Sequence, residues 1–456
     1  MSRDAVEATE ALASAVVKGG FGDLPTDAVA AVKSSILDGF GVAMAGSVEP
    51  LGKIITAYVK DLGGHPQATV LGGGFRTSPP DAALANGAMI HALDYDDSLQ
   101  IFSFHFTSFL LPTVLALGER KGISGKQAIT AFAYGLEAAA AVFRAATSRH
   151  DYDRGWHRTA TVGTLAATAA GAKVLELDVQ QTRIALGIAA SQAAGIRQNF
   201  GTMTKPLHSG LTARNGVTAA MLAQRGWTAD PGVLEGPLGF CKVFFGDGHY
   251  DLANLHASLS RPFHYVSSIR IKKFSACGQA ARPIEAMLSL VKEHDIRPEQ
   301  VERIECGINP GVMNILVHSN PRTGLEGKFS AEFCLAVALL GRKVVLDDFT
   351  DARVNEPAVQ SLMRKVRKYA DPEVPHHGGK GPTVTVITTD GRKLCRRIDM
   401  EEDQPWPAPT ERERIEKFRD CAKRVLNERN IQDALELTQN LENLQNVRQL
   451  VAAMSA

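Results

Sequence analysis

Four segments of the 456-residue chain place titratable side chains among apolar neighbours, where such groups can do chemistry. The first segment reads NGAMIHALDYDD. If it continues as a helix, His91 and Asp94 lie three residues apart and share one face. A carboxylate at that place can accept a proton from a substrate. The alternative is that Asp94, Asp96 and Asp97 are solvated residues at a helix C-terminus, or bind the amides of the next turn.

The second segment, IFSFHFTSFLLP, places His105 between aromatic residues. Burial disfavours the charged form of an imidazole, and an imidazole that is neutral near pH 7 is a useful general acid or base. The alternative for a single histidine in an apolar stretch is a core residue whose hydrogen bonds are satisfied.

The third segment, RGWHRTATVGTLAATAAGAKVL, predicts a helix of small residues. Thr159 is a plausible N-cap for this helix, since threonine accepts hydrogen bonds from the first free amides. His157 comes just before it, so its ring can face a pocket at the helix start.

The fourth segment, NFGTMTKPLHSGLTARNG, predicts a helix with Pro206 at its first position and Lys205 at its mouth. Free amides and the helix macrodipole attract anions to such an end. Thr202 and His208 add donors, so the segment suits the binding of a substrate carboxylate. The alternative is an ordinary solvated helix start.

These segments lie in a region, from Thr26 to Arg225, that is typical of successive helices. Ser124 with Gln127 forms a capping-box pattern, as does Asp178 with Gln181, and Gly226 follows a helical stretch where a C-terminal cap is expected. The helices are rich in Ala, Gly and Thr, which lets their axes approach closely. We predict a large all-helical domain over residues 1–261.

After Pro262 the pattern changes to a smaller α+β domain, predicted over residues 262–400. SSIRIKKF and VERIECGIN resemble β-strands, a charged helix is expected to end near Tyr369, and Asp390-Gly391 suits a type I′ hairpin turn. Past the proline-rich QPWPAP, residues 401–456 are expected to return to the helical domain. The predicted fold is therefore mainly α, with an inserted α+β domain.

Composition excludes several classes of function. The 50 basic and 49 acidic residues give a formal net charge of +1. The chain therefore lacks the excess of positive charge that is typical of proteins that bind nucleic acid or an anionic membrane. The N-terminus carries charges where a signal peptide needs an apolar run, and we expect no membrane span. We therefore expect a cytoplasmic protein.

A metal or another cofactor is not expected. The six cysteines are scattered, with no CxxC pair, and no histidine pair has ligand spacing except His376-His377 in the Gly-rich loop HHGGKGP.

Taken together, the segments identify a family. The chain resembles the MmgE/PrpD family over nearly its whole length, in five stretches that keep the family's order: HALDYDD…HFTSFLLP, RGWHRTATVGTL, GTMTKPLHSGLTARNG, KKFSACGQAARPIEAM and FSAEFCLAVALL. Members include 2-methylcitrate dehydratase, cis-aconitate decarboxylase and iminodisuccinate epimerase. The resemblance implies a helical domain with an inserted α+β domain, a homodimer, catalysis without metal, and a small di- or tricarboxylic acid as substrate.

The resemblance also implies roles for single residues. The family's catalytic side chains fall on Asp94, His105, His157 and Lys205, although the loop that carries His105 is one residue longer here.

Substrate-binding positions follow in the same way. The family's hydroxyl residue falls on Ser98, and the lysine before its Tyr-Pro-x-Cys motif falls on Lys272 or on Lys273.

Two departures from the family concern the α+β domain. A histidine commonly found four residues after the motif cysteine is Ala281 here, and a tyrosine of the FS-x-x-Y segment is Phe333. Arg282, next to the missing histidine, is a candidate replacement cation. These departures put the particular reaction in doubt more than the site.

The reactions of the family share one chemical need, which is to control charge beside a carboxylate while a proton moves on or off carbon. Fixed cations must stabilise the enolate-like species, and Lys205 and Lys272 suit that role. A base must reach the carbon acid, and His157, His105 and Asp94 suit that role.

Dehydration of a 2-methylcitrate-like hydroxy acid is the expected reaction. Iminodisuccinate epimerisation is the second possibility and cis-aconitate decarboxylation the third. A non-catalytic, polycarboxylate-binding relative of these enzymes is the remaining class.

Overall fold

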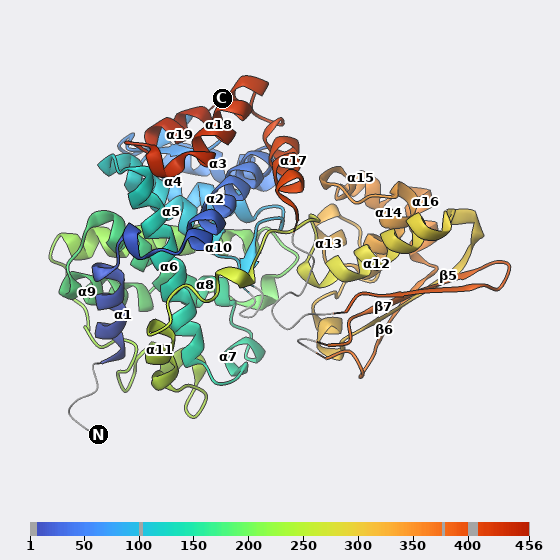
Figure 1. Cartoon of the computed structure of the whole chain (residues 1–456), viewed down its shortest axis with the longest axis horizontal. Helices are drawn as coiled ribbons and strands as arrows, with labels where there is room; N and C mark the ends of the chain where they lie inside the picture. The colour runs from blue at the N-terminus through green and yellow to red at the C-terminus, as the bar shows by residue number, and fades with distance from the viewer. Residues whose placement is uncertain (1–6, 100–103, 376–378, 400–408, 456) are drawn as a thin grey trace. The chain divides into compact units, whose positions relative to one another are not determined.

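The computed structural model describes residues 7–99, 104–375, 379–399 and 409–455. The chain divides into two compact units (Figure 1). We call them the helical unit, Met1–Ala92 with Asp96–Ile271 and Glu411–Ala456, and the smaller unit, Leu93–Tyr95 with Lys272–Thr410. The predicted fold class is confirmed, since the chain is mainly helical with a small mixed sheet in its C-terminal region.

The helical unit contains the helices α1 (Ala8–Lys18), α2 (Thr26–Ser47), α3 (Pro50–Leu62), α4 (Pro79–His91), α5 (Thr107–Lys121), α6 (Gly125–Ala145), α7 (His150–Asp153), α8 (Arg158–Leu175), α9 (Val179–Ala190), α10 (Thr204–Gln224), α11 (Leu252–Leu259), α17 (Glu411–Ala422), α18 (Glu428–Gln439) and α19 (Arg448–Ala453). Two short antiparallel pairs join it: β1 (Ala68–Val70) with β2 (Phe75–Thr77), and β3 (Ser98–Leu99) with β4 (Ile269–Arg270).

Glycines let the central helices of this unit pack backbone against backbone. A Cβ on Gly87 of α4 would lie 2.9 Å from the Cα of Gly210 in α10, and a Cβ on Gly216 would lie 2.5 Å from the Cβ of Ala167 in α8. Because real Cβ atoms do not approach so closely, larger residues would force the helices apart. The predicted close approach of the helix axes is therefore present, and it brings the ends of α4, α8 and α10 together.

Local signals in the sequence predicted some helix ends and missed others. Both capping boxes, Ser124 with Gln127 and Asp178 with Gln181, are present. Gly226 follows α10 with a φ of +85°, as a C-terminal cap requires.

Two predicted helix starts were wrong. The helix α8 begins at Arg158 with His157 as N-cap, so Thr159 lies inside the first turn. The helix α10 begins at Thr204, two residues before Pro206. Proline fits any position of a first turn, because the amide that it lacks is unpaired there.

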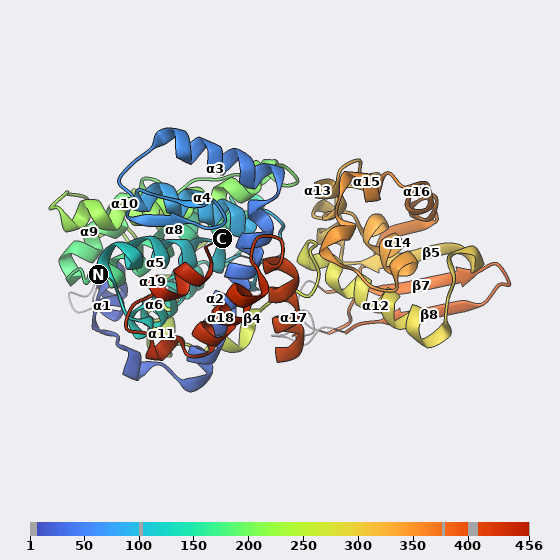
Figure 2. The same ribbon diagram turned by 90° about the horizontal axis from the view of Figure 1, so that it is seen from above.

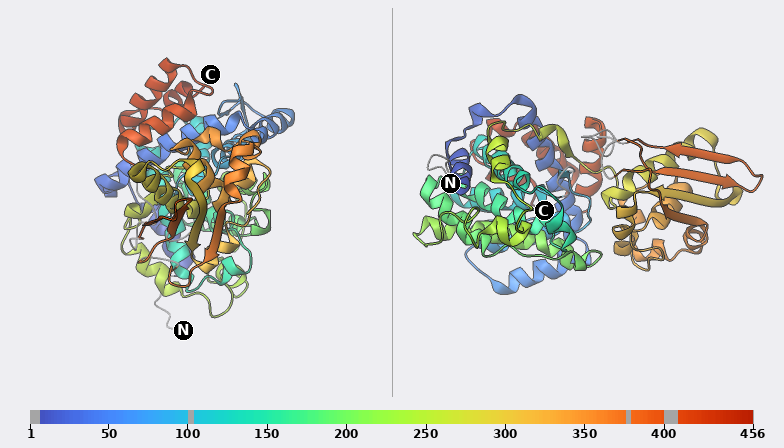
Figure 3. Two further views of the ribbon diagram at one scale, coloured as in Figure 1. Left: turned by 90° about the vertical axis from the view of Figure 1, so that its right-hand side faces the viewer. Right: turned by 90° about the horizontal axis from the view of Figure 1, so that it is seen from below.

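The smaller unit contains the helices α12 (Gly278–His294), α13 (Gly324–Gly327), α14 (Ala331–Gly341), α15 (Asp351–Val354) and α16 (Pro357–Met363) and the strands β5 (Val301–Ile308), β6 (Val366–Ala370), β7 (Thr383–Thr388) and β8 (Lys393–Arg397). The sheet order is β6-β5-β7-β8, with β5 and β6 parallel and the other pairs antiparallel. The helices cover one face of this sheet (Figures 2 and 3).

Three expectations for this region need correction. Residues up to Ile271 belong to the helical unit, because Ile269 and Arg270 pair with β3. The stretch before Tyr369 is strand β6 and not a helix, because it pairs with the buried strand β5. The hairpin turn is not type I′, because only Gly391 of the Asp390-Gly391 pair has a positive φ.

Two helices, α2 and α6, are long and apolar enough to cross a membrane by length and composition alone, although no such stretch was expected. Most of each helix is buried within the helical unit, which is also what the core helix of a globular domain shows.

The C-terminal helices α17 and α18 pack on α2 (Figure 2), and α19 packs on α18 and α5. Lys417 of α17 forms an ion pair with Asp38 of α2, with 2.7 Å between Nζ and Oδ1, and both side chains are buried. The neighbouring Phe418 ring lies over Gly41. A charged pair therefore fixes the C-terminal segment to the core of the helical unit.

Replacement of Lys417 should destabilise the protein, because Asp38 would keep a buried charge without its cation. We expect Lys417→Met to lower the free energy of unfolding by about 3 kcal/mol, measured by urea unfolding. Adding Asp38→Asn should recover much of this loss. The matched control is Lys423→Met, which removes an exposed pair with Asp420 and should change stability by less than about 0.5 kcal/mol. Equal stability of Lys417→Met and the parent would contradict the role of the pair.

Candidate active site

Four histidines of the helical unit gather at the ends of its central helices. His91 is the last residue of α4, His157 is the N-cap of α8, His208 lies in the second turn of α10, and His105 precedes α5. The ring centroids of His91 and His105 are 4.5 Å apart, those of His91 and His157 are 6.5 Å apart, and those of His157 and His208 are 5.2 Å apart. We call these four residues the imidazole cluster.

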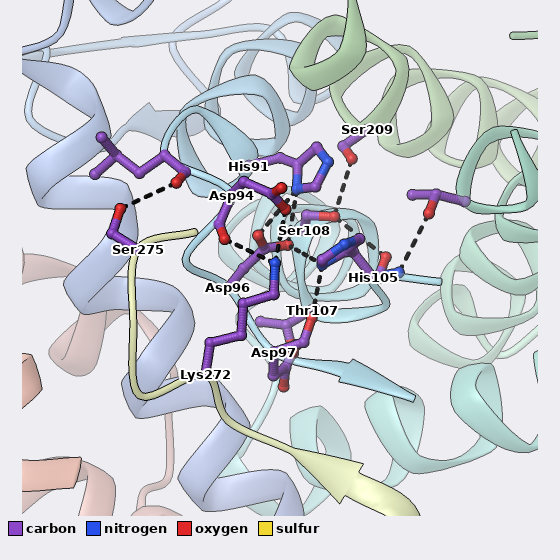
Figure 4. A network of polar contacts seen from close by, with 12 residues as sticks. His91, Asp94, Asp96, Asp97, His105, Thr107, Ser108, Ser209, Lys272 and Ser275 are labelled. Carbon is purple, nitrogen blue, oxygen red and sulfur yellow. Dashed lines mark hydrogen bonds and ion pairs between the residues drawn. The ribbon is translucent and has the colours of Figure 1, made fainter. Parts of the chain in front are cut away.

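Asp96 joins two members of the cluster (Figure 4). Its carboxylate oxygens lie 2.9 and 3.0 Å from Nδ1 of His91, and one of them lies 3.3 Å from Nδ1 of His105. Burial opposes ionisation of this carboxyl, but the two imidazoles outweigh that effect and hold the pKa of Asp96 well below its usual value. An ionised carboxylate only accepts hydrogen bonds, so Nδ1 of His91 donates.

The backbone fixes the tautomer of His105. Its Nδ1 lies 3.0 Å from the carbonyl oxygen of Asp97 (Figure 4). A carbonyl cannot donate, so the proton sits on Nδ1 and the lone pair on Nε2. The hydroxyl of Thr159 accepts from the backbone N–H of His105 at 3.2 Å and fixes the loop further.

His91 is a buried neutral base. Burial lowers the pKa of His91 to about 4, although Asp96 opposes this shift. Since its Nδ1 donates to Asp96, the lone pair lies on Nε2. That atom is buried and has no hydrogen-bond partner among the described residues.

His157 and His208 form a second neutral pair. Their Nδ1 atoms are 3.0 Å apart, so one ring donates and the other accepts. Burial lowers the pKa of His157 well below its usual value and the pKa of His208 to about 4, and the positive charge of Lys205 lowers both further. Both histidines are therefore neutral near pH 7.

Lys205 is the cation whose charge acts on both rings. It is the second residue of α10 and is buried, with Nζ 5.3 Å from the centroid of the Phe200 ring. The positive end of the α10 macrodipole adds to the positive potential. The first turn of the helix offers no further donors, because the amides of its first two residues already bond to Thr202, and Pro206 has no N–H. The predicted anion-binding role of Lys205 stays a prediction. Thr202, in contrast, is exposed and bonds to Asn199 and to its own turn.

Asp97 has a structural role. It is fully buried, and Thr107 donates a hydrogen bond of 2.7 Å to its carboxyl (Figure 4). Burial, together with the charge of Asp38, raises the pKa of Asp97 well above its usual value, which favours the neutral carboxyl. With Asp94 and Asp96 also buried, the alternative of solvated carboxylates at a helix end is wrong.

In the smaller unit, Asp94 pairs with Lys272. The ammonium of Lys272 lies 2.7 Å from both the side chain and the backbone carbonyl of Asp94, and both residues are buried (Figure 4). The φ of Asp94 is +49°, a conformation that few residues other than glycine adopt. The ion pair fixes both side chains, and the roles predicted for Asp94 and Lys272 stay predictions.

Of the other predicted substrate-binding residues, Ser98 is buried and Lys273 is exposed. Ser98 is buried in β3, where it pairs with Arg270. Lys273, in contrast, lies at the surface of the smaller unit with Nζ 3.0 Å from Glu285, so Lys272 is the better choice for the family's lysine.

The departures from the family motif lie in the packed interior of the smaller unit. Phe333 is fully buried in α14 and contacts the Phe349 ring. Arg282 donates hydrogen bonds to the backbone carbonyls of Ile398 and Asp399, which fixes it within the smaller unit. This contact makes Arg282 a poor replacement for the missing histidine at Ala281.

Sequence reasoning missed the roles of Asp96 and His91. The helical spacing paired His91 with Asp94, whereas the structure pairs His91 with Asp96. The acidic residues that follow His91 indicated that one of them could pair with it. The backbone turn at Asp94 determines that the partner is Asp96.

Three side chains of the helical unit could hold a metal ion. One ligand atom from each of His91, Asp96 and His105 lies within 4.8 Å of the others, although no histidine pair at ligand spacing was expected. A metal needs deprotonated ligand atoms. The Nδ1 atom of His105 carries a proton because it donates to the Asp97 carbonyl, so this atom suits a hydrogen bond and not coordination. His376 and His377 lie outside the described residues.

Comparison with known proteins adds independent evidence. Residues 10–253 match the MmgE/PrpD N-terminal domain, and residues 274–443 match the MmgE/PrpD C-terminal domain. A cis-aconitate decarboxylase of Aspergillus terreus is 28% identical over 95% of this chain and 93% of its own length. The human cis-aconitate decarboxylase is 29% identical over 96% and 92%, and the mouse protein is 28% identical over 91% and 86%.

The two domain matches together cover most of the chain, in the order that the sequence stretches predicted. The chain therefore belongs to the MmgE/PrpD family.

Proposed function

We propose that this protein is a lyase that acts on a small polycarboxylic acid, and that its reaction is decarboxylation of cis-aconitate or of a close tricarboxylate. One observation carries the proposal: buried neutral imidazoles lie beside Lys205 at the start of α10. Cis-aconitate comes first because the relatives described above are named for its decarboxylation. This order differs from the sequence-based expectation, which placed dehydration first.

Lys205, at the positive end of the α10 macrodipole, would bind a substrate carboxylate. In decarboxylation, the bond from a carboxyl carbon to its neighbour breaks and carbon dioxide leaves. The electron pair left behind forms a new carbon–carbon double bond, and the original double bond takes up a proton at its far carbon. A fixed cation stabilises the negative charge during this step.

The proton would come from the imidazole cluster. In the free protein His157 is neutral, because burial and Lys205 disfavour its charged form. A bound trianion reverses the local charge and raises the pKa of a neighbouring imidazole. His157 can then be protonated in the complex and deliver its proton to carbon.

Dehydration of a 2-methylcitrate-like hydroxy acid is the second candidate. Such an elimination begins with a base that removes a proton next to a carboxylate. The buried neutral rings of His91, His157 and His208 are bases of this kind in the free protein.

A substrate panel tests the proposal. The purified protein is incubated with cis-aconitate, 2-methylcitrate, citrate and iminodisuccinate, and carbon dioxide release and product formation are measured. We expect carbon dioxide from cis-aconitate, and the same rate after exhaustive dialysis against EDTA. Formation of an alkene from 2-methylcitrate without carbon dioxide would favour dehydration, and no turnover of any compound would favour a binding protein.

Substitutions at His157 and Lys205 should affect different kinetic constants. His157→Ala should lower kcat by about 10²–10⁴, because it removes a proton-transfer group. Lys205→Ala should mainly lower kcat/KM, since a carboxylate contact acts in both the ground and the transition state. Lys273→Ala, at the surface, is the matched control. Parental kcat in folded His157→Ala protein would make His157 a structural residue.

Asp96 should act as a positioning residue, since its carboxylate keeps the protons of His91 and His105 on Nδ1. Asp96→Asn removes a negative charge that raises the pKa of His91, so the acid limb of the kcat/KM profile should move to lower pH. We expect kcat to fall about 10–100-fold, as for other residues that orient a functional imidazole.

Asp97→Asn is the matched control for Asp96→Asn. Burial and Asp38 raise the pKa of the Asp97 carboxyl and favour its neutral form, so the neutral amide should preserve both kcat and the pH profile. An unchanged pH profile in folded Asp96→Asn protein would contradict the positioning role.

A further inference from the structure

A cavity in the helical unit is lined by arginines. Its volume is about 700 Å³, and it lies between the C-terminus of α6, the residues before α7, the start of α8, and α11 with the residues after it. Its lining contains the guanidinium groups of Arg144, Arg149, Arg158 and Arg261, and the imidazole of His264. None of the residues that line it is acidic.

Three of the guanidinium groups make cation–π contacts with aromatic rings. Arg144 lies 5.6 Å from the centroid of the Tyr265 ring, and Arg158 lies 5.5 Å from that of Phe143. Arg149 lies 4.7 Å from the centroid of the Tyr152 ring. Stacking on a ring face orients a guanidinium plane, which reduces the entropy lost when its edge binds a carboxylate or phosphate.

A carboxylate outside the lining neutralises one of these arginines. Arg158 forms a bidentate pair with the buried Asp151, with distances of 2.7 and 2.6 Å. Burial lowers the pKa of Arg149, and the charges of Arg158 and Arg197 lower it further, whereas Tyr152 and Asp153 oppose the shift. The whole chain has a formal net charge of only +1, so a general excess of basic residues does not explain the gathering of these arginines.

Neutral donors complete the lining. The hydroxyls of Ser258 and Tyr265 are hydrogen-bonded at 2.5 Å, and Ser148 and Ser260 add further hydroxyls. A cavity of this volume is within the range of small-molecule sites. Arginine edges with nearby hydroxyls match the oxygens of carboxylates and phosphates.

We propose that this cavity is a binding site for a small anion with two or more negative charges, distinct from the imidazole cluster. None of the four histidines of the cluster lines the cavity, and neither does Lys205. Arg158, however, directly follows His157 at the start of α8. An anion at this site is therefore placed to alter the position or the pKa of His157, and with it the activity.

Calorimetric titration of Lys205→Ala protein with citrate and, separately, with inorganic phosphate tests the site. This substitution weakens anion binding at the imidazole cluster, so the remaining binding reports on the arginine cavity. We expect one binding event per chain with at least one of the two anions, at an ionic strength kept constant with sodium chloride. The two titrations distinguish a carboxylate site from a phosphate site.

Adding Arg149→Gln and Arg261→Gln should weaken this binding at least tenfold. Adding Arg225→Gln, which changes an exposed arginine at the end of α10, should leave it unchanged. Circular dichroism and the unfolding midpoint check that each variant is folded. The absence of binding by Lys205→Ala protein would overturn the proposal, as would equal binding by the arginine variants. These measurements do not depend on turnover, so they remain informative if the proposed reaction is wrong.

Discussion

The arrangement of the imidazole cluster depends on one buried carboxylate. Asp96 is fully buried, and an ionised carboxylate without partners would be strongly destabilising there. The imidazole N–H groups of His91 and His105 offset that cost, at 2.9 and 3.3 Å. This contact joins the end of α4 to the loop before α5 and leaves both Nε2 atoms as proton acceptors. The same hydrogen bonds therefore fix the fold locally and set the chemistry of the rings.

Close helix packing makes this contact possible. Gly87 and Gly210 let α4 and α10 touch through their backbones, and Gly216 does the same for α10 and α8. The C-terminus of α4 and the N-termini of α8 and α10 therefore lie close together, and each contributes a polar residue. His91 ends α4, His157 caps α8, and Lys205 lies in the first turn of α10. Helices built from larger residues would keep these groups too far apart to share protons.

The sequence predicted the fold class and four of the grouped residues, because His105, His157, Lys205 and His208 lie in segments with clear local signals. It did not predict the pairing of His91 with Asp96, since helical spacing favours a partner three or four residues away. Asp94 instead adopts a φ of +49°, which ends the helical path and turns Asp96 back towards His91. A non-glycine residue in this conformation is held there by tertiary contacts, here the buried pair with Lys272, and such contacts leave no local signature. Similarly, the charged stretch before Tyr369 forms a strand because it pairs with β5. The residues of the stretch alone do not indicate this pairing.

Burial makes the protonation state of the imidazole cluster depend on the charge of a bound ligand. Since burial and Lys205 together disfavour charge on His157 and His208, the free protein holds these rings neutral, and they are ready to accept protons. A polycarboxylate brings two or three negative charges into the same volume, where the low dielectric strengthens each interaction. The negative charge of the ligand therefore raises the pKa of these histidine rings above its value in the free protein. The protonation state of the site is thus coupled to the charge of its ligand, so an acid is generated only where an anionic substrate is present to receive its proton.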